Sequence, residues 1–239
     1  LRKDFLTQGP QVNRFENKLR EKFGARYCSV VSSGTAALHL IYLSMGLNEN
    51  SAIITTPITF LASASCVYHS QAKVAFVDIS KNTYTIDPNQ LETMLKKYKR
   101  SVKSVIAVDY AGNPCDWESL RYLSKRYKFH LINDSCHSMG SKYYNDQKYA
   151  IKYADFVTQS FHPVKAITTG EGGSILSNSK FYDEKFKILR NHSMIKNKSR
   201  HWEYKVYEAG QNYRITDFQC ALGISQLKKL NQFVKIRRD

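Results

Sequence analysis

The segments KSVIAVDY (103–110), DWESLRYLSKRYK (116–128) and HLINDS (130–135) follow one another and decide the fold class. Their hydrophobic patterns predict a strand, a helix and a second strand. This order is typical of parallel strands joined by a helix that covers one face of a sheet. The sequence therefore predicts an α/β fold.

The same alternation continues in both directions along the chain. Further strands are expected at 27–33, 51–57, 73–79, 155–161 and 173–178, and helices at 11–24, 34–46, 60–70, 87–98, 181–192 and 216–230. Gly24 is expected to end the first helix, Asp87 and Pro88 to begin the fourth, and Thr216 with Gln219 to cap the last. We expect a mostly parallel sheet flanked by helices, with a loop at 195–213 that is rich in lysine and aromatic residues.

Composition narrows the class of protein. The 239 residues are 42% hydrophobic and 23% charged, as is usual for a globular protein, and the chain shows no apolar run long enough to predict a membrane span. The net charge of +16 favours anionic partners such as phosphorylated small molecules, although a generally lysine-rich composition would also produce it. The cations are spread along the chain, so we do not expect a nucleic-acid-binding protein.

The cysteines and the chain ends add two expectations. Five cysteines without a C-x-x-C pair predict neither a disulfide framework nor a metal site, and they fit a reducing cytoplasm. The sequence begins at Leu1 and stops within the charged, helix-like run 226–239. We therefore expect a chain that is cut at both ends.

Ligands in α/β folds bind at the carboxyl ends of the strands, and two motifs fall there. SSGTAAL (32–38) lies at a strand-to-helix junction, where Gly34 and Thr35 leave backbone N–H groups free for a phosphate, although such a stretch also caps helices for structural reasons alone. In NDSCH (133–137), Asp134 ends an apolar strand and needs a cationic partner such as a pyridinium nitrogen, unless it only caps the next turn. His137 is alternatively a structural histidine.

Two more motifs lie at expected strand ends. Phe60 ends PITF (57–60) and is placed to stack on a flat cofactor or to pack in the core. Ser160 and Lys165 lie in SFHPVKAITTGEGGSIL (160–176), where apolar neighbours are expected to bury the lysine and favour its neutral, nucleophilic form. A phosphate cradle, an aspartate, an aromatic ring and such a lysine together are what pyridoxal 5'-phosphate requires.

Several blocks of the sequence resemble a known family. SFHPVKAITTGEGG (160–173) resembles the lysine motif of the DegT/DnrJ/EryC1/StrS family of sugar aminotransferases, and 1–16, 32–40, 55–64 and 211–227 match further blocks in the expected order. QCALGISQLKKL (219–230) is most similar to the C4 aminotransferases of pseudaminic acid biosynthesis. The resemblance implies the large, cofactor-binding domain of a fold type I pyridoxal-phosphate-dependent transferase over 1–239, with an incomplete N-terminal segment and without the small C-terminal domain.

The resemblance also implies roles for single residues. Lys165 would form the Schiff base with the cofactor and shuttle the proton, and Asp134 would pair with the pyridine nitrogen. The other implied contacts are His137 with the phenolic oxygen, Phe60 with the ring, Gly34, Thr35 and Ser160 with the phosphate, and Asn212 with the phosphate in a neighbouring subunit.

The implied reaction moves an amino group from glutamate to a nucleotide-linked 4-keto-6-deoxy sugar, in a homodimer with shared sites. Arg190, Lys196, Arg200 and Arg214 are expected near the site, where they would attract the nucleotide diphosphate, although for any single one of them a solvated surface position is the favoured alternative. Two alternatives stay open. One is a related sugar dehydratase, which is disfavoured because those members carry histidine in the place of Lys165, and the other is a catalytically impaired fragment that keeps the fold and weak cofactor binding.

Overall fold

A seven-stranded sheet forms the centre of the computed structural model, which describes residues 5–197, 199–200 and 202–239. Its order is β1-β7-β6-β5-β4-β2-β3. The strands are β1 (Tyr27–Val31), β2 (Ala52–Thr55), β3 (Lys73–Phe76), β4 (Val102–Val108), β5 (His130–Asp134), β6 (Phe156–Ser160) and β7 (Gly173–Ser177). Strand β7 is antiparallel to both of its neighbours, and the other adjacent pairs are parallel. The prediction of a mostly parallel sheet is confirmed.

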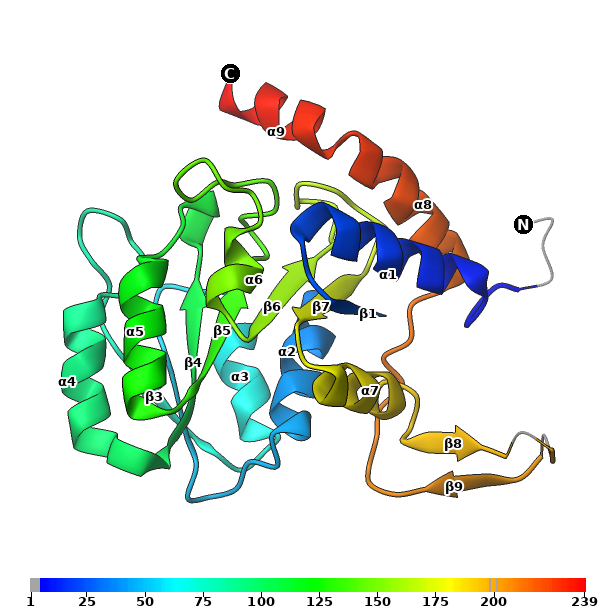
Figure 1. The fold of residues 1–239 in the computed structure, drawn as a ribbon, viewed down its shortest axis with the longest axis horizontal. Coiled ribbons are helices and arrows are strands. Elements are labelled where there is room, and N and C mark those ends of the chain that lie inside the picture. The colour runs from blue at the N-terminus through cyan, green and yellow to red at the C-terminus, as the bar shows by residue number, and fades with distance from the viewer. Residues whose placement is uncertain (1–4, 198, 201) are drawn as a thin grey trace.

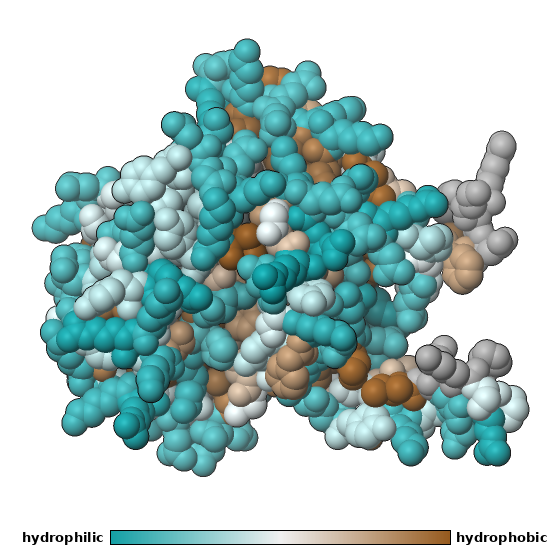
Figure 2. Space-filling model, viewed as in Figure 1, coloured by the Kyte–Doolittle hydropathy of each residue, from teal (hydrophilic) through white to brown (hydrophobic). Residues whose placement is uncertain are grey.

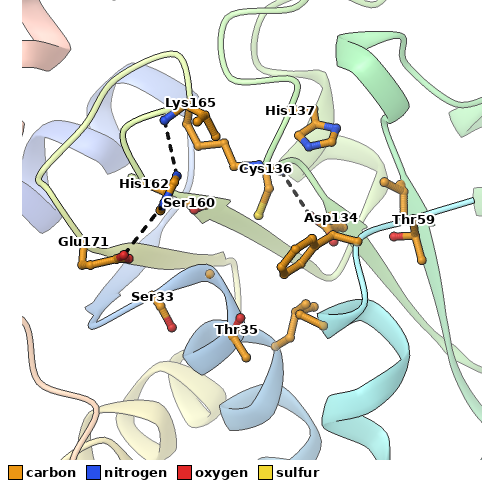
Figure 3. A pocket seen from close by; sticks show the side chains of 16 residues that line it. Ser33, Thr35, Thr59, Asp134, Cys136, His137, Ser160, His162, Lys165 and Glu171 are labelled. Atoms are coloured by element: carbon orange, nitrogen blue, oxygen red, sulfur yellow. Dashed lines mark hydrogen bonds and ion pairs between the residues drawn. The ribbon is translucent and has the colours of Figure 1, made fainter.

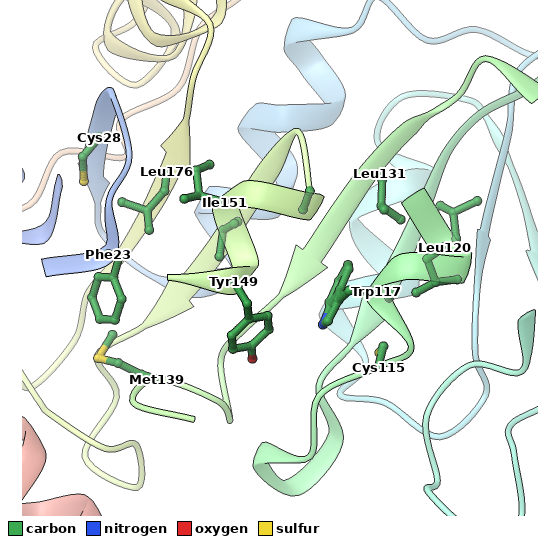
Figure 4. Packing of buried hydrophobic residues seen from close by; sticks show 14 of the residues in the cluster. Phe23, Cys28, Cys115, Trp117, Leu120, Leu131, Met139, Tyr149, Ile151 and Leu176 are labelled. Carbon is green, nitrogen blue, oxygen red and sulfur yellow. The ribbon is translucent and has the colours of Figure 1, made fainter. Parts of the chain in front are cut away.

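Helices cover both faces of the sheet (Figure 1). They are α1 (Pro10–Phe23), α2 (Gly34–Ser44), α3 (Ala62–Tyr68), α4 (Pro88–Tyr98), α5 (Trp117–Tyr127), α6 (Tyr149–Tyr153), α7 (Lys180–Leu189), α8 (Asp217–Lys228) and α9 (Leu230–Arg238). Helices α2, α3 and α7 enclose one apolar core against the sheet, and α1, α4, α5, α6 and α8 enclose the other. Figure 4 shows the second core, in which the rings of Trp117 and Tyr149 lie 6.4 Å apart.

The three expected helix ends are present. Gly24 adopts a left-handed conformation, with φ of +75°, after α1. The Asp87 carboxylate accepts hydrogen bonds from two backbone N–H groups at the start of α4, and Thr216 and Gln219 form the capping box of α8. These ends are set by local side chain–backbone chemistry, which is why short-range patterns locate them.

The sequence missed three features. The expected loop at 195–213 contains a hairpin of β8 (Met194–Lys196) and β9 (Tyr204–Val206), which projects from the body (Figures 1 and 2). Helix α6 was not anticipated because five residues are too few for a periodic pattern, and the last helical run divides at Lys229 into α8 and α9. Short 3₁₀ turns, η1 (Lys99–Ser101) and η2 (Tyr110–Gly112), follow α4 and β4.

The cysteines, the helix lengths and the polarity of the surface bear on the expectations drawn from composition. All five cysteines are free, and among the described residues no group of three His, Cys, Asp or Glu side chains is placed to hold a metal ion. None of the helices in the described ranges is long and apolar enough to cross a membrane. The face in Figure 2 is mostly hydrophilic, with apolar side chains visible between polar ones.

A buried carboxylate fixes the carboxyl ends of β4 and β5. Asp109 follows β4, is fully buried, and accepts five hydrogen bonds. The donors are the Cys115 N–H, the Trp117 indole, the Asn133 amide, and the Ser138 and Tyr149 hydroxyls. Burial raises the pKa of Asp109, and these hydrogen bonds oppose that rise. The carboxylate thereby joins β4, α5, β5, α6 and the loop after β5.

We expect Asp109→Asn to lower the free energy of unfolding by about 2–4 kcal/mol, since an amide NH₂ cannot accept the donors that face the carboxylate. Urea denaturation followed by circular dichroism measures this loss. Asp116→Asn is the matched control, because Asp116 caps α5 at the surface and asparagine caps equally well. Equal midpoints for the two variants would contradict a structural role for the Asp109 network.

Candidate active site

A cavity of about 440 Å³ opens where β4, β5 and β6 end and α2 begins (Figure 3). Its volume lies within the usual range for small-molecule sites. Seven of the eight residues that the sequence singled out line it: Gly34, Thr35, Phe60, Asp134, His137, Ser160 and Lys165. Asn212 does not line it. Instead, Asn212 is exposed and pairs through its backbone with Asn191.

The amino terminus of α2 forms one wall of the cavity. Ser33 caps the helix, because its Oγ accepts a hydrogen bond from the Ala36 N–H at 3.0 Å. The N–H groups of Gly34 and Thr35 have no acceptor among the residues that the structure describes. Free N–H groups and the positive end of the helix dipole favour an anion such as a phosphate here.

Close packing explains the glycines around this helix end. A Cβ on Gly34 would lie 3.0 Å from Ser160 Cβ and 3.2 Å from Cys136 Sγ. A Cβ on Gly173, in β7, would lie only 2.5 Å from the carbonyl carbon of Ser33. The glycine-rich turn after Lys165 therefore lets β7 support the backbone from which α2 starts.

Asp134 lies at the end of β5 with only 5% of its surface exposed. One carboxylate oxygen accepts from the Ser63 hydroxyl at 2.8 Å, and the other accepts from the Cys136 N–H at 3.2 Å. The carboxylate forms no ion pair within the described part of the chain. A buried carboxylate without a cation is costly, so this arrangement favours a cationic ligand in the cavity.

Lys165 reaches the cavity from a turn after β6, and it differs from the expectation of a buried lysine. It is only partly buried: Pro163 and Val164 on one side of it are exposed, whereas Ile167 turns into the core and does not cover it. The turn is closed by a hydrogen bond from the Lys165 N–H to the His162 carbonyl at 2.9 Å. Its ammonium group has no hydrogen-bond or ion-pair partner in the described ranges, so it is free to react with a ligand.

His137 is exposed at the rim, and its ring meets the edge of the Tyr110 ring at a centroid distance of 6.2 Å. Desolvation and the Lys165 cation lower the pKa of His137, and the Asp134 carboxylate opposes this. A neutral imidazole can donate or accept a hydrogen bond at the cavity.

Phe60 and Ser160 complete the predicted set. Phe60 is 68% exposed although it is aromatic, so it is not the core residue that one interpretation of PITF expected. An exposed ring at a cavity wall offers a face for stacking. The Ser160 hydroxyl lies at the end of β6 and accepts a weak hydrogen bond from the His162 N–H at 3.4 Å.

The sequence missed a short hydroxyl chain that supports Asp134. Ser63 donates its only hydroxyl proton to Asp134, so the 2.8 Å contact between Thr59 and Ser63 places the Thr59 hydroxyl as the donor to Ser63. Both residues belong to TTPITFLASA, but no spacing rule connects that block with Asp134. Cys136, His162 and Glu171 also line the cavity, and His162 lies 4.0 Å from Glu171.

Of the four cations expected near the site, the three arginines are not in the walls of this cavity. Arg190 pairs with the buried Glu16 at 2.7 Å and, with Arg214, lines a separate cavity of about 210 Å³. Arg200 pairs with Glu203 in the loop of the β8–β9 hairpin, and the side chain of Lys196 lies outside the described part of the structure. The expectation is therefore wrong for these three arginines and this cavity in the single chain, and for Lys196 it stays a prediction.

Comparisons with known proteins identify relatives of the whole chain. Residues 1–239 match the DegT/DnrJ/EryC1/StrS aminotransferase family. A UDP-4-amino-4,6-dideoxy-N-acetyl-beta-L-altrosamine transaminase of Campylobacter jejuni is 41% identical over 239 residues, which are all of this chain and 62% of that protein. The chain therefore spans less than two thirds of the length of this relative.

Two solved structures share the fold. The aminotransferase PseC of Helicobacter pylori, described as involved in the biosynthesis of pseudoaminic acid, is 36% identical, with a TM-score of 0.87 over 95% of this chain and 60% of that one. A putative sugar aminotransferase of Streptococcus pneumoniae, Spr1654 in its PMP form, is 28% identical, with a TM-score of 0.90 over all of this chain and 65% of that one. The expected fold type I architecture is confirmed.

We expect Lys165→Gln to raise the pKa of His137, because the substitution removes a cation that disfavours the imidazolium. Titration of the histidine ring signals by NMR measures this. Lys180→Gln, at the surface of α7, is the control and should leave the His137 titration unchanged. An unchanged pKa in Lys165→Gln would show that the lysine does not face His137 as described.

Proposed function

The chain belongs to the DegT/DnrJ/EryC1/StrS aminotransferase family, and on that basis we propose that it is a pyridoxal-phosphate-dependent aminotransferase. It transfers an amino group from glutamate to a nucleotide-linked 4-keto-6-deoxy sugar, with UDP as the nucleotide. The observation that carries the proposal is the pair of uncompensated charges in one cavity. The free ammonium of Lys165 and the buried carboxylate of Asp134 both line the space at the start of α2.

The residues present fit pyridoxal phosphate. Gly34, where a Cβ would make tight contacts with Ser160 and Cys136, and the free N–H groups of the first turn of α2 would hold the phosphate together with Thr35 and Ser160. Asp134 would pair with the pyridinium nitrogen, Phe60 would stack on the ring, and His137 would contact the phenolic oxygen. When bound, the cofactor supplies an electron sink that makes a C–H bond next to nitrogen acidic.

The protein's own groups would move the proton, orient the Asp134 carboxylate and position the amine. Lys165 Nζ would hold the cofactor covalently, and as a free amine it would move a proton between two carbons. The Thr59–Ser63 hydroxyl chain donates to Asp134 and orients the carboxylate in the cavity. The turn from His162 to Lys165 sets the position of the amine relative to the cavity.

Two considerations support a UDP-linked sugar as the acceptor. The 41% identical relative is named for a UDP-linked 4-amino-4,6-dideoxy sugar. The net charge of +16 also favours association with a nucleotide diphosphate. The sugar product would serve the synthesis of a surface polysaccharide or of flagellin sugars in the cytoplasm.

The dehydratase alternative is disfavoured by Lys165, because the dehydratases of this superfamily would carry histidine at its position. The alternative of an impaired fragment makes a different prediction, since it requires weak or absent cofactor chemistry in a folded protein. Spectra of the protein with pyridoxal phosphate distinguish an active aminotransferase from such an impaired fragment.

We further propose a homodimer with shared active sites. Asn212 lies outside the cavity of its own chain and is exposed, so a cofactor contact by its side chain requires a neighbouring subunit. The QNYR segment that carries it is held in place, because the Tyr213 carbonyl accepts from the Ser32 N–H at 2.9 Å and the Tyr213 N–H donates to the Arg190 carbonyl at 3.0 Å. A segment fixed in this way presents Asn212 outward without reordering.

We expect the protein mixed with pyridoxal phosphate to show a visible absorption band that borohydride traps as a covalent adduct at Lys165 and that glutamate bleaches. Lys165→Ala should lose the band and reduce turnover with UDP-4-keto sugars by about 10²–10⁴-fold or more. Spectra and peptide mass spectrometry measure both effects. A folded parent protein without the band would support the impaired fragment instead.

We expect mixtures of Lys165→Ala and Asn212→Ala chains to be more active than either variant, because each mixed dimer contains one intact site. Asn212→Ala alone should lower activity by roughly tenfold. Activity after subunit exchange in low urea measures the rescue. The control mixes Lys165→Ala with Asp134→Asn, two residues of the same cavity, which should give no rescue. Activity equal to the average of the separate variants would place Asn212 in its own subunit's site.

A further inference from the structure

A second cavity of about 370 Å³ adjoins the first. Four residues line both cavities: Cys136, His137, Val164 and Lys165. The far side of the second cavity is formed by the 3₁₀ turn η2 and by α9, through Val234, Arg237 and Arg238. Lys165 thus stands in the wall between the first cavity and a second, more open space.

The charge of the second cavity is one-sided. Lys165, Arg237 and Arg238 line it, and no aspartate or glutamate is among its lining residues. One guanidinium nitrogen of Arg237 donates to the Lys165 carbonyl at 2.9 Å. Neither arginine forms an ion pair with a carboxylate in the part of the chain that the structure describes. Their remaining N–H groups are therefore available to an anion.

The bond from Arg237 to the backbone of Lys165 keeps this cationic group close to the reacting lysine. An amino acid carries its α-carboxylate on the same carbon as its amine. When that amine reacts next to Lys165, the carboxylate must lie within a few bond lengths. The diphosphate of a nucleotide sugar is different, because the pyranose ring separates it from a keto group at C4. An anion site directly beside the lysine therefore fits a carboxylate better than a diphosphate.

We propose that the second cavity is the subsite for a carboxylate of the amino donor, bound by the guanidinium groups of Arg237 and Arg238. This inference rests on the proposed function for the identity of the ligand. Guanidinium groups suit the role because their planar N–H donors match the two oxygens of a carboxylate. Ala111 and His137, which are exposed at its rim, leave the cavity accessible from solvent.

The test measures binding of glutarate, a dicarboxylate without an amine, to the protein without cofactor by isothermal titration calorimetry. Arg238→Gln should raise the Kd for glutarate by about five- to tenfold, and so should Arg237→Gln. Added salt should weaken binding to the parent protein, since the site is partly exposed. Lys235→Gln is the matched control, because it removes one charge from α9 without touching the cavity, and its Kd should stay within about twofold.

UDP is titrated in parallel to show whether the arginines bind a carboxylate or the diphosphate of the nucleotide. Unchanged UDP affinity in Arg238→Gln, together with weaker glutarate binding, supports the subsite. Weaker UDP binding with unchanged glutarate binding would assign the arginines to the nucleotide and overturn the inference. Arg238→Gln carries the test, because Arg237 also holds the turn at Lys165 and its loss would move that turn.

Failure of the subsite and failure of the proposed function give different results. A protein that binds glutarate through these arginines but never exchanges an amino group contradicts the proposed function alone. A protein that transaminates with the same KM for glutamate in Arg238→Gln as in the parent contradicts the subsite alone.

Discussion

The buried carboxylate of Asp109 is the interaction on which the active-site side of the fold depends. Five donors from strand β5, helices α5 and α6 and two loops converge on its two oxygens. One of them, Asn133, directly precedes Asp134, and another, Ser138, directly follows His137. The network therefore fixes the backbone on both sides of the residues that face the cavity. An isolated buried charge would be costly, but here each oxygen is satisfied by more than one donor, so rigidity is obtained without an ion pair.

The sequence predicted the sheet, most helices and the cavity residues because those features depend on local patterns. At strand ends such as Asp134 and helix starts such as Gly34 the hydrophobic pattern of the sequence changes. Parallel strands bring such positions to the same edge of the sheet. Contacts between distant segments were not visible. No pattern pairs Ser63 with Asp134 or Arg237 with Lys165, because these contacts depend on how α3 and α9 pack. The expected burial of Lys165 failed for the same reason, since neighbours in sequence do not surround a side chain in a turn.

The two unpaired charges of the cavity show how function constrains stability. A direct ion pair between Lys165 and Asp134 would satisfy both groups. Instead, each residue is positioned by separate hydrogen bonds. Asp134 takes donors from α3 and from its own loop, and Lys165 is fixed only through its backbone. A ligand with a cationic end, a flat ring and an anionic end would compensate the carboxylate and the helix terminus together. Binding of such a ligand should therefore stabilise the folded protein by mass action.

The position of β7 in the sheet also governs when the fold can form. Strand β1 lies at the sheet edge and pairs only with β7, and the backbone of Ser33 just beyond β1 rests against Gly173 at the start of β7. During synthesis β1 leaves the ribosome long before residue 177 does, so its strand partner is missing while β2 to β6 are made. Long-range pairing of this kind slows folding and leaves an apolar strand exposed to wrong partners. The amino-terminal end of α2 is thus among the last parts of the nascent chain to become ordered.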